Sequence, residues 1–182
     1  MRIIAGDAKN KKLKTRKGKE TRPTLGSMKE SLFSIIAPYV PGSRFLDLFS
    51  GSGSISLEAL SRGAKKAIMI EKDSEALKFL IENVNNLGYD DRCRAYKNDV
   101  FRAIEILARK GEKFDIIFMD PPYKDEVCTR VLKHIQKYEL LAEGGLIICE
   151  HHLFEEMANE IGEFKKADER KYGKKCITFY TR

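Results

Sequence analysis

The segment Asp120-Pro121-Pro122-Tyr123 holds the residues whose types and order best suit a chemical reaction. It follows an apolar run over 114–119 that has the composition of a buried strand. Two consecutive prolines remove two backbone N–H donors, so the segment offers hydrogen-bond acceptors. The Asp120 carboxylate and the Pro121 carbonyl could each accept an N–H bond from an exocyclic amine, while Tyr123 stacks on its ring. The pattern favours methylation of a base amine, and a Pro-rich turn is the alternative.

A second motif, Asp47-Leu48-Phe49-Ser50-Gly51-Ser52-Gly53, joins an apolar run to the start of a helix. Gly51 and Gly53 permit positive φ and let a ligand approach the backbone amides at the helix start. The third glycine of a dinucleotide-binding loop is replaced by Ser56, and the acidic Asp47 precedes the turn. A carboxylate suits a cationic group better than a phosphate, which favours S-adenosylmethionine, a ligand with an ammonium and a sulfonium.

Two further acids stand where predicted strands end. Glu71 follows the run over 66–70 and could accept both hydroxyls of a ribose, and Asp99 follows 93–98 and could accept from an adenine amine. Taken alone, each is a solvated loop acid or a helix cap. Together with Asp47 and Asp120 they close four strand-to-helix junctions at one sheet edge. The expected cofactor contacts are Asp47, Phe49, Ser50, Gly51, Gly53, Glu71, Lys72, Asp99 and Val100.

The positive charge is concentrated at the start of the chain. Residues 1–44 hold eleven Lys or Arg and three acids, out of 34 and 27 in the 182 residues, so the remainder has 23 basic and 24 acidic residues. Such a run, which includes Lys11, Lys12 and Arg22, is typical of a basic arm or hairpin on RNA phosphates. A solvated tail is the alternative. Lys124, next to the acceptor motif, is a further candidate for contact with the substrate.

Hydrophobic periodicity predicts alternating strands and helices. A capping box at Ser27 should start a helix that stops near Pro38, and Asp73 should cap a helix that ends at Gly88, with a buried stripe at residues 76, 77, 80, 81, 84 and 87. Other helices are expected near 54–62, 101–110, 125–138 and 152–161. Strands are expected near 44–49, 66–71, 92–97, 114–119 and 145–150, with an antiparallel hairpin over 164–170 and 175–180. This alternation predicts an α/β fold with a mostly parallel sheet.

Residues 44–150 resemble the class I S-adenosylmethionine-dependent methyltransferases, and the two ends of the chain narrow the resemblance. The whole chain resembles the bacterial 16S ribosomal RNA guanine-N2 methyltransferase family. The segments that carry it are Arg2-Ile3-Ile4-Ala5-Gly6, Lys11-Lys12-Leu13, Thr21-Arg22-Pro23-Thr24, Glu30-Ser31-Leu32-Phe33 and Leu57-Glu58-Ala59-Leu60-Ser61-Arg62-Gly63-Ala64. The resemblance implies a Rossmann-like fold with a seven-stranded sheet, a basic arm over 1–22 and a methyltransferase domain over 23–182. It also implies a substrate guanine in 16S rRNA or a partly assembled small subunit.

Three alternatives share parts of this pattern. An adenine-N6 or cytosine-N4 methyltransferase uses the same acceptor motif, but this chain has no added target-recognition domain. A protein-glutamine methyltransferase typically has Asn in place of Asp120. A non-catalytic rRNA-binding assembly factor could dispense with Asp47, Glu71 and Asp120.

Composition adds weaker expectations. The four scattered cysteines and the Glu150-His151-His152 cluster favour neither a disulfide framework nor a metal site. No apolar run is long enough to span a bilayer. We therefore expect a cytoplasmic protein that binds no metal and no membrane and is a monomer.

Overall fold

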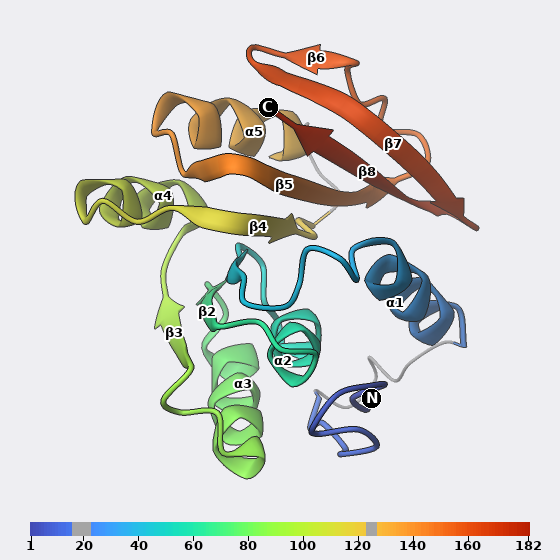
Figure 1. The fold of residues 1–182 in the computed structure, drawn as a ribbon, viewed down its shortest axis with the longest axis vertical. Coiled ribbons are helices and arrows are strands. Elements are labelled where there is room, and N and C mark those ends of the chain that lie inside the picture. Colours follow the sequence, from blue (N-terminus) through green and yellow to red (C-terminus); the bar gives the residue numbers. More distant parts are fainter. Residues whose placement is uncertain (16–22, 123–126) are drawn as a thin grey trace.

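The computed structural model describes residues 1–15, 23–122 and 127–182. A single sheet with helices on both faces forms the centre of the molecule (Figure 1). In chain order the elements are α1 (Pro23–Ile35), β1 (Arg44–Asp47), α2 (Ser54–Ser61), β2 (Lys66–Glu71), α3 (Ser74–Leu87), β3 (Cys93–Lys97), α4 (Val100–Arg109), β4 (Phe114–Met119), α5 (Val127–Lys137), β5 (Leu141–His152), β6 (Glu160–Ile161), β7 (Phe164–Tyr172) and β8 (Lys175–Thr181).

The sheet has the strand order β3-β2-β1-β4-β5-β8-β7-β6. Strands β1 to β5 pair in parallel, while β5–β8, β8–β7 and β7–β6 pair antiparallel. The order reverses between β1 and β4, and open α/β sheets bind ligands beyond the carboxyl ends of the strands at such a point. The predicted C-terminal hairpin is confirmed as β7 and β8. The described residues add β6, a two-residue strand, to the seven strands that were expected.

Two apolar cores cover the two faces of the sheet. Helices α1, α2 and α3 pack on one face against residues such as Phe45, Met69 and Phe118. Helices α4 and α5 pack on the other face against Leu46, Ile117 and their neighbours. Successive residues of β1 and β4 point to opposite faces and most are buried, which explains the unbroken apolar segments Phe45–Leu46 and Ile116–Met119.

Helix α3 has the boundaries that its sequence signals predict. Asp73 is the N-cap, and its carboxylate accepts from the amides of Glu75 and Ala76 at 3.0 and 2.8 Å. Gly88 ends the helix in the left-handed region with φ 69°. Leu80 and Val84 are buried as expected, but Ile81 is wrong as a stripe member because its side chain is 45% exposed.

Two predicted helices differ from the structure. Helix α1 begins at Pro23 rather than at Ser27, because proline with its fixed φ is well suited to a first helical turn. The helix expected near 152–161 is wrong. Strand β5 continues to His152, where it still pairs with Lys175, and the chain then turns towards β6. Pairing with β7 and β8 outweighs the helical propensity of this segment.

The first residues of the chain form a hairpin that packs on α2 and α3 (Figure 1). Arg2 pairs with Lys12 in an antiparallel bridge, and Ile3, Ala8 and Leu13 are buried in the core beside α1, α2 and α3. Gly6 has φ 86°, and a Cβ there would lie 1.7 Å from the Ser61 carbonyl oxygen. We call residues 1–14 the N-terminal hairpin. The predicted boundary of the arm at residue 22 lies outside the described residues.

Candidate cofactor and catalytic site

The predicted cofactor residues gather at the carboxyl ends of β1, β2 and β3. The register pairs Asp47 of β1 with Met69 of β2 and with Phe118 of β4. The amide of Leu48 donates to the Phe118 carbonyl at 3.0 Å, so the chain beyond β1 stays beside β4. This pairing places the loop after β1, the end of β2 and the Asp120 motif along one edge.

Hydrogen bonds to β2 and to the end of β1 hold the glycine-rich loop after β1. The Ser50 amide donates to the Ile70 carbonyl at 2.9 Å, and its hydroxyl donates to the Asp47 carbonyl at 3.0 Å. Gly51 and Gly53 have φ of 54° and 84°, which glycine adopts without strain. No atom lies within 4 Å of the position of a Cβ on Gly51, so there is open space beside the loop. A ligand can therefore approach the backbone here.

Asp47 is buried, and both of its carboxylate oxygens are hydrogen bonded. The Ser56 hydroxyl donates to Oδ2 at 2.8 Å, and the Phe49 amide lies 3.3 Å from Oδ1. Burial raises the pKa of Asp47 to about 7, although the hydrogen bonds from Ser56 and Phe49 act to lower it. The raised pKa brings the titration of this carboxyl group towards neutral pH.

Glu71 and Asp99 end neighbouring strands as predicted. The Glu71 carboxylate accepts from the amides of Gly51 and Asp73, each at 2.7 Å, which fixes it beside the loop. Each oxygen retains a second lone pair, as binding of a ribose diol requires. Asp99 caps α4 through Oδ1, which accepts from Phe101 at 3.0 Å, while Oδ2 lies 3.9 Å from Nζ of the exposed Lys72. Val100 is the buried first residue of α4. This set of acceptors fits a nucleoside with an attached cation.

The acceptor motif begins directly after β4. Met119 pairs with Cys149 of β5, and Asp120 follows as a partly buried residue. Pro121 is buried and Pro122 is exposed, so the two prolines fix the chain between the core and the surface. Tyr123 and Lys124 lie outside the described residues.

The basic residues predicted to bind substrate are only partly described. Lys11 and Lys12 are exposed on the N-terminal hairpin together with Arg2 and Lys9. Lys14 forms an ion pair with Glu82 of α3. Arg22 lies outside the described residues, as do Arg16, Lys17 and Lys19.

The sequence did not indicate the polar side chains that hold the glycine-rich loop and Asp47 through hydrogen bonds. Ser56 binds Asp47, Asn83 of α3 binds the Ser52 carbonyl, and Lys29 of α1 binds the Ser54 hydroxyl at 3.0 Å. The one usable signal for Asn83 was its position three residues after the buried Leu80, where an apolar residue is the norm. Lys29 gave no signal, because a lysine in a helix is usually solvated.

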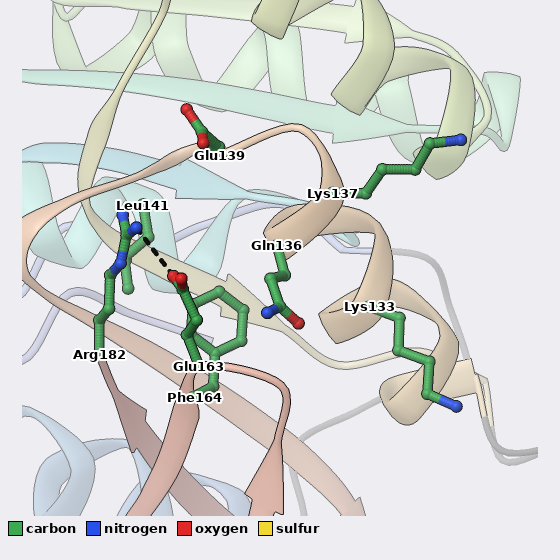
Figure 2. Close-up of a pocket in the computed structure, with 8 residues that line it drawn as sticks. All are labelled: Lys133, Gln136, Lys137, Glu139, Leu141, Glu163, Phe164 and Arg182. Atoms are coloured by element: carbon green, nitrogen blue, oxygen red, sulfur yellow. Dashed lines mark ion pairs between the residues drawn. The ribbon is translucent and has the colours of Figure 1, made fainter.

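A surface cavity lies away from this edge. A hollow of about 380 Å³ is lined by residues such as Lys133 and Lys137 of α5, Leu141 at the start of β5, and Arg182 (Figure 2). Arg182 forms an ion pair with Glu163 at 2.8 Å. Leu141 starts a parallel strand, so this hollow is at the amino edge of the sheet and includes none of the predicted site residues.

Comparisons with known proteins agree with this geometry. Residues 1–181 match the family described as Conserved hypothetical protein 95. YlbH of Bacillus subtilis is 37% identical, and the match covers 99% of this chain and 98% of that protein. The chain belongs to this family. Another relative is the Ribosomal RNA small subunit methyltransferase D of Escherichia coli K12, 34% identical over 82% of this chain and 74% of that protein.

Solved structures place this family in a known fold. The Escherichia coli protein yhhF has a TM-score of 0.88 at 31% identity, and the match covers 100% of this chain and 97% of that chain. The predicted Rossmann-like class I methyltransferase fold is confirmed. Among the described residues, no helix is long and apolar enough to cross a membrane. Within the same ranges, no group of three or more His, Cys, Asp or Glu side chains is arranged to hold a metal ion.

Proposed function

We propose that this protein transfers a methyl group from S-adenosylmethionine to the exocyclic N2 amine of a guanine in 16S rRNA. S-adenosylmethionine is the methyl donor of methyltransferases that share this fold. The observation that carries the proposal is the position of Asp120-Pro121-Pro122, directly beyond β4 and beside the loop that follows β1. Acceptors for an amine thus share an edge with the acceptors Glu71 and Asp99 and the buried Asp47.

Each described residue has a defined part in this reaction. Glu71 would hold the ribose hydroxyls and Asp99 the adenine amine, while the glycine-rich loop lets the cofactor approach the backbone. When bound, S-adenosylmethionine supplies the methyl group. Asp120 and the Pro121 carbonyl would orient the guanine N2 amine, whose nitrogen becomes cationic during attack. The Asp120 carboxylate interacts more strongly with that cation than with the neutral amine, which lowers the barrier. The proton then leaves to solvent.

Mapping of modified nucleotides tests the proposal directly. Small-subunit rRNA from a strain that lacks this protein should lose N2-methylguanine at one position, and the purified protein should restore it in the presence of S-adenosylmethionine. Loss of an N6-methyladenine or N4-methylcytosine instead would assign the same site to another amine. If no methyl group is lost or restored, the protein acts on RNA without catalysis or on another substrate.

Cofactor affinity is expected to rise as the pH increases from about 6 to about 7.5. Burial raises the pKa of Asp47 to about 7, and only its ionised form attracts the cofactor ammonium. Binding therefore favours the deprotonated carboxyl and releases a proton. Titration calorimetry in buffers of different ionisation enthalpy measures that release. Asp47→Asn is the control, because it should bind more weakly and with less pH dependence. Equal pH profiles for the two proteins would contradict a direct role for Asp47.

Replacement of Lys11 and Lys12 by alanine is expected to weaken RNA binding and to flatten its salt dependence. Both side chains are exposed on the N-terminal hairpin, where they can bind phosphates and release counterions. The slope of log affinity against log salt is negative, and its magnitude should decrease by about 0.7 for each phosphate that the variant no longer neutralises. Binding of a small-subunit rRNA fragment to the double alanine variant measures it. The matched control is Lys133→Ala with Lys137→Ala, two lysines of α5 that line the hollow drawn in Figure 2. An unchanged slope would mean that these lysines are merely solvated.

A further inference from the structure

We propose that Asn83 is a positioning residue for cofactor binding, and that the backbone of the N-terminal hairpin supports the cofactor loop through this side chain. This inference rests on the proposed function, because it assigns the glycine-rich loop to the cofactor. Asn83 lies on α3, far in sequence from both partners, and is 1% exposed. Its side chain joins the two segments that the sequence assigned to separate tasks.

The Asn83 amide group makes hydrogen bonds in two directions. Its Oδ1 accepts from the Lys14 amide at 2.7 Å, and its Nδ2 donates to the Lys14 carbonyl at 2.9 Å. The same Nδ2 donates to the Ser52 carbonyl at 2.9 Å. One buried side chain therefore pairs with the end of the hairpin as a neighbouring strand would, and also holds the loop.

The Ser52 carbonyl is in a part of the loop where the backbone can reorient easily. It lies between Gly51 and Gly53, which both have positive φ, and glycine permits reorientation of the adjoining peptide at low cost. The amide of Gly51 donates to Glu71 at 2.7 Å, and the amide of Gly53, which belongs to the same peptide as the Ser52 carbonyl, donates to Ser50 at 2.7 Å. Asn83 binds the carbonyl end of that peptide, so both polar groups of the peptide have a partner. It thereby selects one conformation of the loop before the cofactor arrives.

A second buried side chain makes the same connection at the other end of the loop. Lys29 of α1 is 6% exposed, and its ammonium donates to the Arg2 carbonyl at 3.2 Å and to the Ser54 hydroxyl at 3.0 Å. It also pairs with Glu58 at 3.0 Å. The loop is thus joined to the hairpin on both sides, by Asn83 at Ser52 and by Lys29 at Ser54. The exposed lysines of the hairpin and its backbone consequently have different tasks, RNA binding for the former and support of the cofactor loop for the latter.

Calorimetry with S-adenosylhomocysteine separates this role from simple loss of stability. Asn83→Ala and Asn83→Asp both remove the donor to Ser52 and should weaken binding about fivefold or more. Asn83→Asp keeps the acceptor for the Lys14 amide but places its second acceptor oxygen against the Lys14 and Ser52 carbonyls, so it should disturb the loop at least as much as Asn83→Ala. In turnover, the cofactor KM should rise while kcat at saturating cofactor stays within about twofold of the wild type. Asn86→Ala, at an exposed asparagine one turn along α3, should bind as the wild type does.

Val84→Ala is the control for loss of stability. Val84 is the buried residue next to Asn83, and its apolar side chain makes no hydrogen bond to the loop. The inference is overturned if Asn83→Ala binds with wild-type affinity. It is also overturned if Val84→Ala, at an equal loss of melting temperature, weakens binding as much. Failure of the wild-type protein to bind S-adenosylhomocysteine would overturn the cofactor site itself. These results are distinguishable, because only the last one affects the wild type.

Discussion

Asp120→Ala is expected to slow methyl transfer by about 10²-fold or more while the cofactor and the RNA still bind. The carboxylate acts chiefly as the amine becomes charged, so its removal affects the transition state more than the ground state. Asp120 lies at the carboxyl end of β4 and is partly buried. Single-turnover transfer of a radiolabelled methyl group to rRNA, with protein in excess, measures the chemical step without product release.

Asp120→Asn makes the test sharper, because it keeps one acceptor oxygen and removes the charge. We expect it to retain more activity than Asp120→Ala and less than the wild type. Asp115→Asn is the matched control, because Asp115 is near the start of β4 and its carboxylate accepts from the Arg44 amide at 2.7 Å, away from the carboxyl edge. If Asp120→Ala transfers methyl groups as fast as the wild type, the motif is a structural turn.

Glu58→Ala is expected to lower the free energy of unfolding by about 3–5 kcal/mol, the usual cost of removing one partner from a buried ion pair. Glu58 is fully buried, with Lys29 at 3.0 Å and Arg62 at 2.8 Å, and it accepts from the amides of Ile4 and Ala5. The variant leaves the Lys29 ammonium buried without its carboxylate. Denaturant unfolding measures the loss, and Glu143→Ala, at an exposed acid, is the control.

The pH dependence of stability gives a second measure of the same pair. Burial acts to raise the pKa of Glu58, but the Lys29 ammonium and the hydrogen bonds from Ile4 and Arg62 outweigh it and leave the pKa below its usual value. A depressed carboxyl pKa stabilises the fold above the pKa of the unfolded chain. That contribution disappears as the pH falls through the folded value. Glu58→Gln should lack this acid-dependent step, and equal profiles would contradict the assignment.

Local signals were sufficient for the elements that have their own start and stop residues. Asp73 and Gly88 fixed the ends of α3, and the apolar runs located the buried strands β1, β2 and β4. The parallel sheet then followed from alternation, and it brought Asp47, Glu71 and Asp99 to one edge as predicted. The segment after β5 was different, because its conformation depends on β8. The Leu153 amide donates to the Lys174 carbonyl at 2.9 Å, an interaction that no local pattern contains.

In the candidate site too, some features follow from local sequence and others depend on distant parts of the chain. Residue types at strand ends indicated which side chains could meet a cofactor, but not how each one is held. The ionisation of Asp47 depends on burial and on Ser56, and the loop depends on Asn83. These contacts join helix, loop and hairpin over long stretches of sequence. They become visible only after the chain has folded.

The attachment of the N-terminal hairpin to α2 and α3 also constrains the order in which the chain can fold. The hydroxyl of Tyr89 donates to Asp7, and Leu13 is buried in the same core as Leu80 and Val84. On the ribosome, about 75 more residues must be synthesised after residue 14 before Tyr89 can bind Asp7. At roughly 5–20 residues per second this takes several seconds. Until α3 is made, Ile3 and Leu13 are exposed apolar residues within a strongly basic segment. The hairpin can reach its buried position only after that interval.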